Sequence, residues 1–214
     1  GMGGNGGSSA GETSGTVSIY GGTVTATGGS GGNGASAGIG GGQGGKTNNQ
    51  GGGGNVTITG GTVTATGGKN STGAVQAPGI GGAVYSSSQG NAGSFSTGEN
   101  GSAVITTTGG IQASTSGCSA IIDNKVYGNV TLPDSQYGKS LTVSSRANLT
   151  IPDGAALTGS ITVESGGTLT VNSGSTVTNT GTITVESGGT LTGTGTIQNT
   201  SSGTVTGGTG DVKV

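Results

Sequence analysis

Residues 161–170, ITVESGGTLT, recur letter for letter at residues 183–192, which is a 22-residue repeat (183 − 161 = 22). In and around both copies, short phrases alternate β-branched or apolar residues with Thr, which is the period-2 pattern of a β-strand. Gly, Ser and Asn separate the phrases and are typical of turns. Three strands and three corners in each repeat predict one coil of a three-sided β-solenoid. The fold class we expect is therefore all-β, a single-stranded right-handed parallel β-helix.

Such a repeat predicts columns of matching side chains along the solenoid. Successive coils of a parallel β-helix stack at the spacing between strands, about 4.8 Å. Val163 should then lie beneath Val185 and point inward. Leu169 should lie beneath Leu191 in a second inward column, while the flanking Thr side chains point outward. A constant repeat suits a solenoid because each coil buries its apolar side chains only against its neighbours.

The N-terminal part repeats with a longer period. The phrase GGTVTATGG occurs at 21–29 and again at 60–68, which is a 39-residue repeat (60 − 21 = 39). A V-x-I phrase precedes each copy and a G-I-G-G phrase follows it, so three short strands again make one coil. A third, more degenerate coil is predicted from three segments, with the longest loop before it at residues 84–101; these segments are 102–107, 109–114 and 118–123.

We therefore predict one β-helix domain over residues 1–214, with wide, long-loop coils over 1–127 and compact coils over 128–214. Apolar residues make up only 27% of the chain, so disorder is a rival interpretation. Charged residues are only 7%, however, and little repels the chain open. The Gly runs at 28–34 and 48–55 fit ordered corners or loops, and equally flexible linkers.

Composition excludes several functions. Six Lys and Arg residues and a net charge of −2 argue against a nucleic-acid partner. No apolar run reaches the roughly 18 residues that a spanning helix needs, so no membrane span is expected. The chain has no His and one Cys, which excludes Ser-His-Asp and Cys-His catalytic groups and His-based metal sites. Cys118 is expected to be a small buried residue.

The most specific candidate for catalysis or metal binding is a pair of carboxylates. If the 22-residue register holds, Glu164 and Glu186 stack about one strand spacing apart. That separation suits the two carboxyl groups of a retaining glycosidase, about 5–5.5 Å. It also suits a Ca²⁺ site, the one cofactor we consider. A third interpretation is a pair of solvated corner residues. We expect no catalytic residue and name Glu164 and Glu186 as candidate Ca²⁺ ligands.

The candidate ligand-binding residues are Tyr20, Tyr85 and Glu99. Tyr20 alternates with the inward Val17 and Ile19 and should point outward, whereas Tyr85 lies in a loop. These rings could stack on sugars, or they could cover a flank of the solenoid. The outward Thr rows are compatible with an ice-binding surface, and equally with the ordinary preference of Thr for exposed strand positions.

The phrases VTITGGTVTATGG with GIGGA, and ITVESGGTLTV, resemble the repeats of secreted bacterial β-helix proteins. These include repeat-rich surface proteins of gut anaerobes and the calcium-associated carbohydrate-binding β-helix proteins of clostridia. The resemblance covers most of the chain. It implies a right-handed parallel β-helix outside the cell, secreted or on the cell surface, that binds a plant or host polysaccharide.

The function we predict is a non-catalytic, adhesin-like structural module that binds a polysaccharide or surface glycan. The first alternative is a polysaccharide-degrading β-helix of lyase or hydrolase type, and the second is an ice-binding solenoid. The stretch 205–214 shows no obvious polar cap. Since open coils expose strand edges, we expect a continuing chain, self-association end to end or along a flank, or a lid formed by residues 211–214.

Overall fold

The computed structural model describes residues 2–3, 13–45, 49–74, 76–99 and 101–214. The chain forms two compact units. Unit 1 comprises Gly1–Thr97 with Ala103–Ser116, and unit 2 comprises Gly98–Ser102 with Gly117–Val214. The division into a single domain with wide coils to residue 127 stays a prediction.

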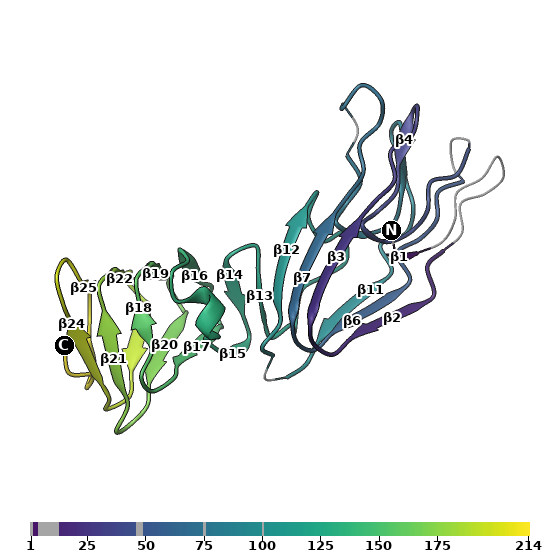
Figure 1. Cartoon of the computed structure of the whole chain (residues 1–214). Coiled ribbons are helices and arrows are strands. Elements are labelled where there is room, and N and C mark those ends of the chain that lie inside the picture. The colour runs from purple at the N-terminus through teal and green to yellow at the C-terminus, as the bar shows by residue number, and fades with distance from the viewer. Residues whose placement is uncertain (1, 4–12, 46–48, 75, 100) are drawn as a thin grey trace. The chain divides into compact units, whose positions relative to one another are not determined.

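Unit 1 contains three parallel sheets, and successive coils supply their strands (Figure 1). Alternating Val, Ile and Thr residues form the two longer sheets, because inward apolar and outward polar residues suit one buried face. The first sheet contains β2 (Thr16–Ile19), β6 (Asn55–Ile58) and β11 (Ser94–Thr97); the second contains β3 (Thr23–Thr27), β7 (Thr62–Thr66) and β12 (Val104–Thr108); the third contains β1 (Met2–Gly3), β5 (Ile39–Gly40) and β8 (Ile80–Gly81).

The predicted 39-residue register is confirmed. Val17 pairs with Val56, and Val24 pairs with Val63, both in parallel ladders. The third phrase of each coil also stacks, with Ile39 beside Ile80. Each wide coil therefore contributes one strand to each of three ladders, as the repeated V-x-I, T-V-T-A and G-I-G-G phrases predict.

The third wide coil differs from the sequence prediction. Its first strand is β11, which pairs with β6 and lies inside the predicted loop 84–101. Phe95 alone is apolar in the phrase SFST, so this strand shows no alternation of apolar residues. The segment 102–107 instead supplies the second strand, β12 against β7, and Ile111 bridges to Ile80 as the third.

The segment 118–123 is therefore wrongly assigned to that coil. Its core, β13 (Ala120–Ile122), forms an antiparallel hairpin with β14 (Lys125–Tyr127) in unit 2. The turn is made by Asp123 and Asn124, whose φ angles of 48° and 65° are those of a two-residue hairpin loop. Cys118 is buried at the start of this segment, as predicted.

The Gly-rich run 28–34 is an ordered loop, not a linker. Its end lies in a small antiparallel sheet of β4 (Gly34–Ala35), β9 (Val84–Tyr85) and β10 (Ser88–Gln89). The amide of Ser36 donates to the Gly29 carbonyl at 2.9 Å, which closes the loop. Gly28 is required here, because a Cβ atom would collide with the Ser36 carbonyl oxygen. In the second run, residue 48 lies outside the described residues, and Gly53 donates to the Asn91 carbonyl.

Unit 2 is the compact β-helix that the 22-residue repeat predicts (Figure 1). Its first sheet contains β14, with β13 on one side, then β16 (Leu141–Val143), β19 (Ser160–Val163), β22 (Thr182–Val185) and β25 (Thr204–Thr206). The second contains β15 (Asn129–Thr131), β17 (Asn148–Ile151), β20 (Thr168–Val171) and β23 (Thr190–Thr192). The third contains β18 (Ala156–Leu157), β21 (Thr176–Asn179) and β24 (Thr196–Asn199); a short 3-10 helix, η1, spans Asp134–Gln136.

The predicted columns are confirmed. Val163 pairs with Val185, and Leu169 pairs with Leu191, in parallel ladders. Val163, Leu169 and Leu191 are all buried. The chain is thus an all-β parallel β-helix, and its right-handed winding stays a prediction from the general preference of parallel crossovers.

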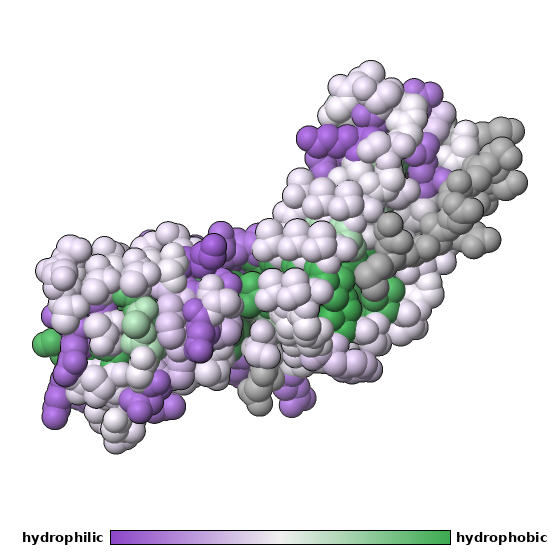
Figure 2. Space-filling view, in the orientation of Figure 1, coloured by the Kyte–Doolittle hydropathy of each residue, from purple (hydrophilic) through white to green (hydrophobic). Residues whose placement is uncertain are grey.

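Residues 211–214 lie against the last described coil, as the lid alternative expects. The Lys213 amide donates to the Gly195 carbonyl at 3.1 Å, and the Ile197 amide donates to the Lys213 carbonyl at 2.7 Å. Val212, within this segment, is buried. Pale tones from the middle of the hydropathy scale dominate the face shown in Figure 2. Within the described residues, no helix has the length and apolar character to cross a membrane.

Candidate functional site

A groove in unit 1 lies at the corner that leads into β2, β6 and β11. Its volume is about 340 Å³. Three successive coils contribute to it, because the same corner is repeated at each 39-residue step. The lining residues are Thr13, Ser14, Gly15, Thr16, Gly52, Gly53, Gly54, Asn55, Asn91 and Gly93.

Glycine backbone shapes this corner. Gly54 and Gly93 have φ angles of +65° and +73°, a conformation that side chains with a Cβ rarely adopt. A Cβ atom on Gly54 would also collide with the Ser14 carbonyl oxygen. The corners are joined by backbone hydrogen bonds: the Asn55 amide donates to Gly15 at 3.1 Å, and the Ser94 amide donates to Gly54 at 2.8 Å. The groove is thus bordered by a rigid ladder.

Uncharged polar groups line the groove. The Ser94 hydroxyl donates to Oδ1 of Asn55 at 2.8 Å, which fixes the amide and leaves its Nδ2 protons for a ligand. The Gly52 amide donates to Oγ1 of Thr13 at 3.3 Å, so the hydroxyl proton of Thr13 can still be donated. The side chains of Thr16 and Asn91 make no hydrogen bond within the described part of the chain. This arrangement suits a ligand rich in hydroxyl groups.

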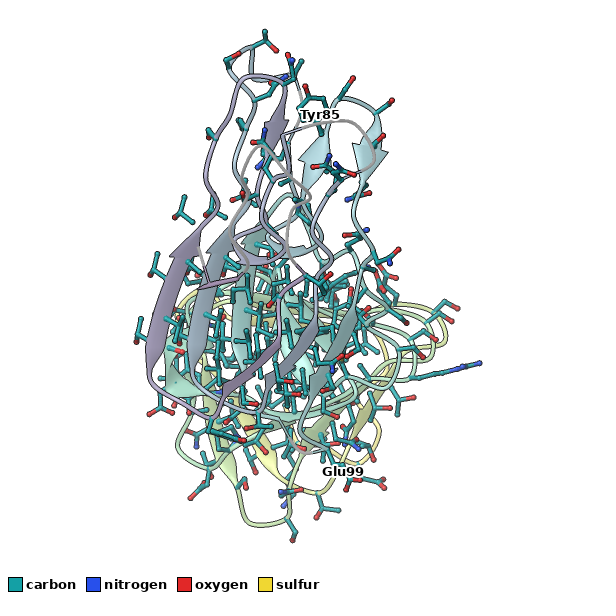
Figure 3. The ribbon with its side chains drawn as sticks, turned by 90° about the vertical axis from the view of Figure 1, so that its right-hand side faces the viewer. Tyr85 and Glu99 are labelled. Atoms are coloured by element: carbon teal, nitrogen blue, oxygen red, sulfur yellow. The ribbon has the colours of Figure 1, made fainter. Side chains whose placement is uncertain are left out.

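The sequence-predicted aromatic residues lie away from this groove. Tyr20 is 77% exposed and follows β2 at the end opposite the groove. Tyr85 lies among the loops in Figure 3, where the Nδ2 of Asn33 donates to its hydroxyl at 3.3 Å. Tyr20 precedes β3, while the loop that pairs with Tyr85 follows β3. Glu99 is exposed in unit 2. Within unit 1, Tyr20 and Tyr85 thus lie at different places, and the role of all three residues stays a prediction.

Glu164 and Glu186 occupy equivalent positions on neighbouring coils, and the stacking of their side chains stays a prediction. They directly follow the paired Val163 and Val185 on neighbouring coils. Oε1 of Glu164 lies 3.8 Å from Nζ of Lys125, and the two side chains are 38% and 47% exposed. An ion pair this exposed contributes little stability. Among the described residues no three His, Cys, Asp or Glu side chains gather as a metal site would require. The Ca²⁺ assignment stays a prediction.

Sequence reasoning missed the groove, although the repeat carries a signal for it. Thr16, Asn55 and Ser94 are successive equivalents at 39-residue steps, and each follows a Gly directly before a strand. A polar residue kept at one repeat position, beside Gly, marks a corner where several coils present similar groups. The signal is weak in a chain with 55 Gly, since Gly precedes polar residues throughout.

One comparison with known proteins gave a match. A family model described as "Beta helix repeat" matches residues 17–43 and 56–84. These stretches cover nearly all of β2 to β5 and of β6 to β8, the strands of two successive wide coils. Searches of curated proteins and of solved structures found no match. The matched stretches cover about a quarter of the chain. Together with the parallel strand registers, the match supports the parallel β-helix fold.

Proposed function

We propose that this β-helix is a non-catalytic, adhesin-like module, secreted or displayed on the cell surface, that binds a polysaccharide in the groove of unit 1. The observation that carries the proposal is the uncharged, hydroxyl- and amide-lined groove repeated over three coils. A rigid ladder with a spacing of about 4.8 Å presents these groups in a fixed row. Such a row suits an extended chain with repeating hydroxyl groups.

The lining favours a neutral glycan over an acidic one. None of the ten lining residues carries a charged side chain. A uronate carboxylate in the groove would lose water without gaining a cationic partner, and unpaired burial of a charge is costly. Sugar hydroxyl groups both donate and accept, and so match Asn91 and the hydroxyl of Thr16. We therefore expect binding that depends weakly on salt.

A groove-filling substitution tests the proposal. A Cβ atom on Gly15 would meet nothing within 4 Å, and the residue does not have the positive φ that favours glycine. Gly15→Leu should therefore fill the groove while the fold is kept. Gly32→Leu is the matched control, since Gly32 is equally open and lies outside the groove.

The assay is a glycan array followed by affinity electrophoresis in neutral xylan, mannan and arabinan and in acidic pectin. We expect retardation by a neutral polymer that Gly15→Leu abolishes and Gly32→Leu preserves. Equal retardation of both variants would place the binding elsewhere. Tyr20→Ala, Tyr85→Ala and Glu99→Gln, run beside them, measure what the sequence-predicted residues add.

The non-catalytic part of the proposal has its own test. Glu164 and Glu186 follow paired residues on neighbouring coils and are the candidate carboxylate pair, so a reducing-sugar assay on pectins and xylans is the direct check. We expect no turnover. Turnover that disappears in a Glu164→Gln, Glu186→Gln variant would establish the polysaccharide-degrading alternative.

Aligned Thr rows support ice binding as a second candidate function. Thr23, Thr25 and Thr27 of β3 pair in register with Thr residues of β7, which are Thr62, Thr64 and Thr66. Thr side chains are stiff at χ1, so their methyl and hydroxyl groups form a regular array. Measurable thermal hysteresis at micromolar protein would support this function, and its absence would remove it.

A further inference from the structure

A second polar depression lies in unit 2, over the outer face of β15 and β17. Its volume is about 230 Å³. It is lined by Asn129, Val130, Thr131, Asn148 and Thr150. Asn129 pairs with Asn148 and Thr131 pairs with Thr150 in a parallel ladder, so two neighbouring coils again present the same groups.

The two Asn residues are unusual for their positions. In the same outward column, β20 and β23 carry Thr168 and Thr190. Thr favours strands, whereas Asn is depleted in them. A strand with Asn at a position where the neighbouring strands have Thr is therefore less favoured by intrinsic strand propensity. Such departures are expected where a side chain serves a function.

A hydrogen bond orients one of these amides. Oγ1 of Thr170 donates to Oδ1 of Asn148 at 2.8 Å, from the next coil. The Nδ2 protons of Asn148 therefore remain for a ligand. The groove of unit 1 contains the same arrangement, in which Ser94 of the next coil donates to Oδ1 of Asn55 at 2.8 Å. In both places a hydroxyl on a neighbouring coil fixes an Asn amide at the edge of an uncharged cavity.

We propose that the depression over β15 and β17 is a second subsite for the same neutral glycan. The ligand class rests on the function proposed for unit 1, and the site itself rests on the cavity and the oriented Asn148. Asn129, Thr131 and Thr150 make no side-chain hydrogen bond within the described part of the chain, so their polar groups can contact sugar hydroxyls. One chain then presents two separate binding sites to a polymer.

Two subsites on one chain have a measurable consequence. The second contact with a polymer becomes intramolecular, and such linkage raises overall affinity by about 10²–10⁴ when both sites are engaged at once. A short oligosaccharide bound at one site gains nothing from the other. Polymer affinity and oligosaccharide stoichiometry therefore report on the second site separately.

The test compares two double variants on one ladder. Asn129→Ala with Thr131→Ala removes the exposed polar groups of β15. Thr190→Ala with Thr192→Ala is the matched control, because these residues occupy the same two columns on β23. The probes are a neutral xylan, mannan or arabinan that the array selects, and a short oligosaccharide cut from it. Titration calorimetry gives stoichiometry, and affinity electrophoresis gives polymer binding.

We expect the Asn129→Ala, Thr131→Ala variant (the β15 variant) to halve the number of oligosaccharides bound per chain and to weaken polymer binding at least about tenfold. The β23 variant should change neither. If stoichiometry is the same in both variants and only Gly15→Leu abolishes binding, the second subsite is wrong and the function proposed for unit 1 stands. If Gly15→Leu changes nothing while the β15 variant loses binding, the site over β15 and β17 stands and the function proposed for the groove of unit 1 is wrong. Absence of binding to any glycan overturns both proposals.

Discussion

Replacing Leu169 by Ala tests the stacked interior directly. Leu169 is fully buried and pairs with Leu149 in the coil before and Leu191 in the coil after. The substitution removes three carbon atoms, worth about 2.4 kcal/mol of transfer free energy at about 0.8 kcal/mol each. The backbone ladders on all three sides hinder collapse onto the space, so a cavity penalty adds to this. We expect the free energy of unfolding to fall by about 3–4 kcal/mol.

The measurement is urea unfolding followed by circular dichroism. Thr168→Ala is the control, since Thr168 lies on the same strand but points outward and is not buried. The control should lower the free energy of unfolding by less than about 1 kcal/mol. Because coils of a solenoid can unfold separately, the transition of unit 2 has to be shown to be cooperative first. A Leu169→Ala variant as stable as the control would refute the stacked interior.

Two further predictions concern polar groups of unit 2. Asn179 is fully buried; its Nδ2 donates to the Thr204 carbonyl at 3.2 Å and its Oδ1 accepts from the Gly181 amide at 3.1 Å. Asn179→Ala should therefore lower the free energy of unfolding, measured in urea, by about 3 kcal/mol. A loss below about 1 kcal/mol would contradict this prediction. Burial, followed by the hydrogen bond and negative charge of Asp134, raises the pKa of Tyr137 from 10.0 to about 12. Since the fold prefers the neutral ring, the stability from Tyr137 is complete below pH 10 and is lost as pH rises towards 12. An ultraviolet titration of the wild type minus Tyr137→Phe measures this pKa; Asp134→Asn should lower it, and no change would show that Asp134 has no part in it.

The fold could be predicted where the sequence repeats itself. An identical phrase at 161 and 183 fixes both the strands and their register, because a slip by one residue would turn every apolar side chain outward. The third wide coil has no such copy. Its first strand contains a single apolar residue, Phe95, and its register is set by pairing with β6. This segment forms a strand because it pairs with a neighbouring coil, and no local sequence pattern indicates that pairing.

The candidate binding site could not be predicted in the same way. The groove of unit 1 is made of backbone corners and of short polar side chains that are common throughout the chain. What distinguishes Asn55 from other Asn residues is the Ser94 hydroxyl on the next coil, 39 residues away. Aromatic and acidic residues were chosen as candidates because they are rare, yet within unit 1 Tyr20 precedes β3 whereas Tyr85 pairs with β4, which follows β3. The rarity of a residue type draws attention to single residues, whereas a binding site requires several residues that lie close together.

Stacking also explains how a chain with 27% apolar residues can fold. A side chain inside a middle coil is covered from above and below, and Val163, Leu169 and Val177 are each 0% exposed. At the first and last described coils, Val24 and Val205 are only half-buried. An apolar residue such as Val or Leu thus contributes its full burial, about 1.5–3 kcal/mol, most readily when a coil lies on both sides. Short strands with one or two inward residues suffice because the repeat supplies both neighbours, which leaves the outward and corner positions free for Thr, Asn and Gly.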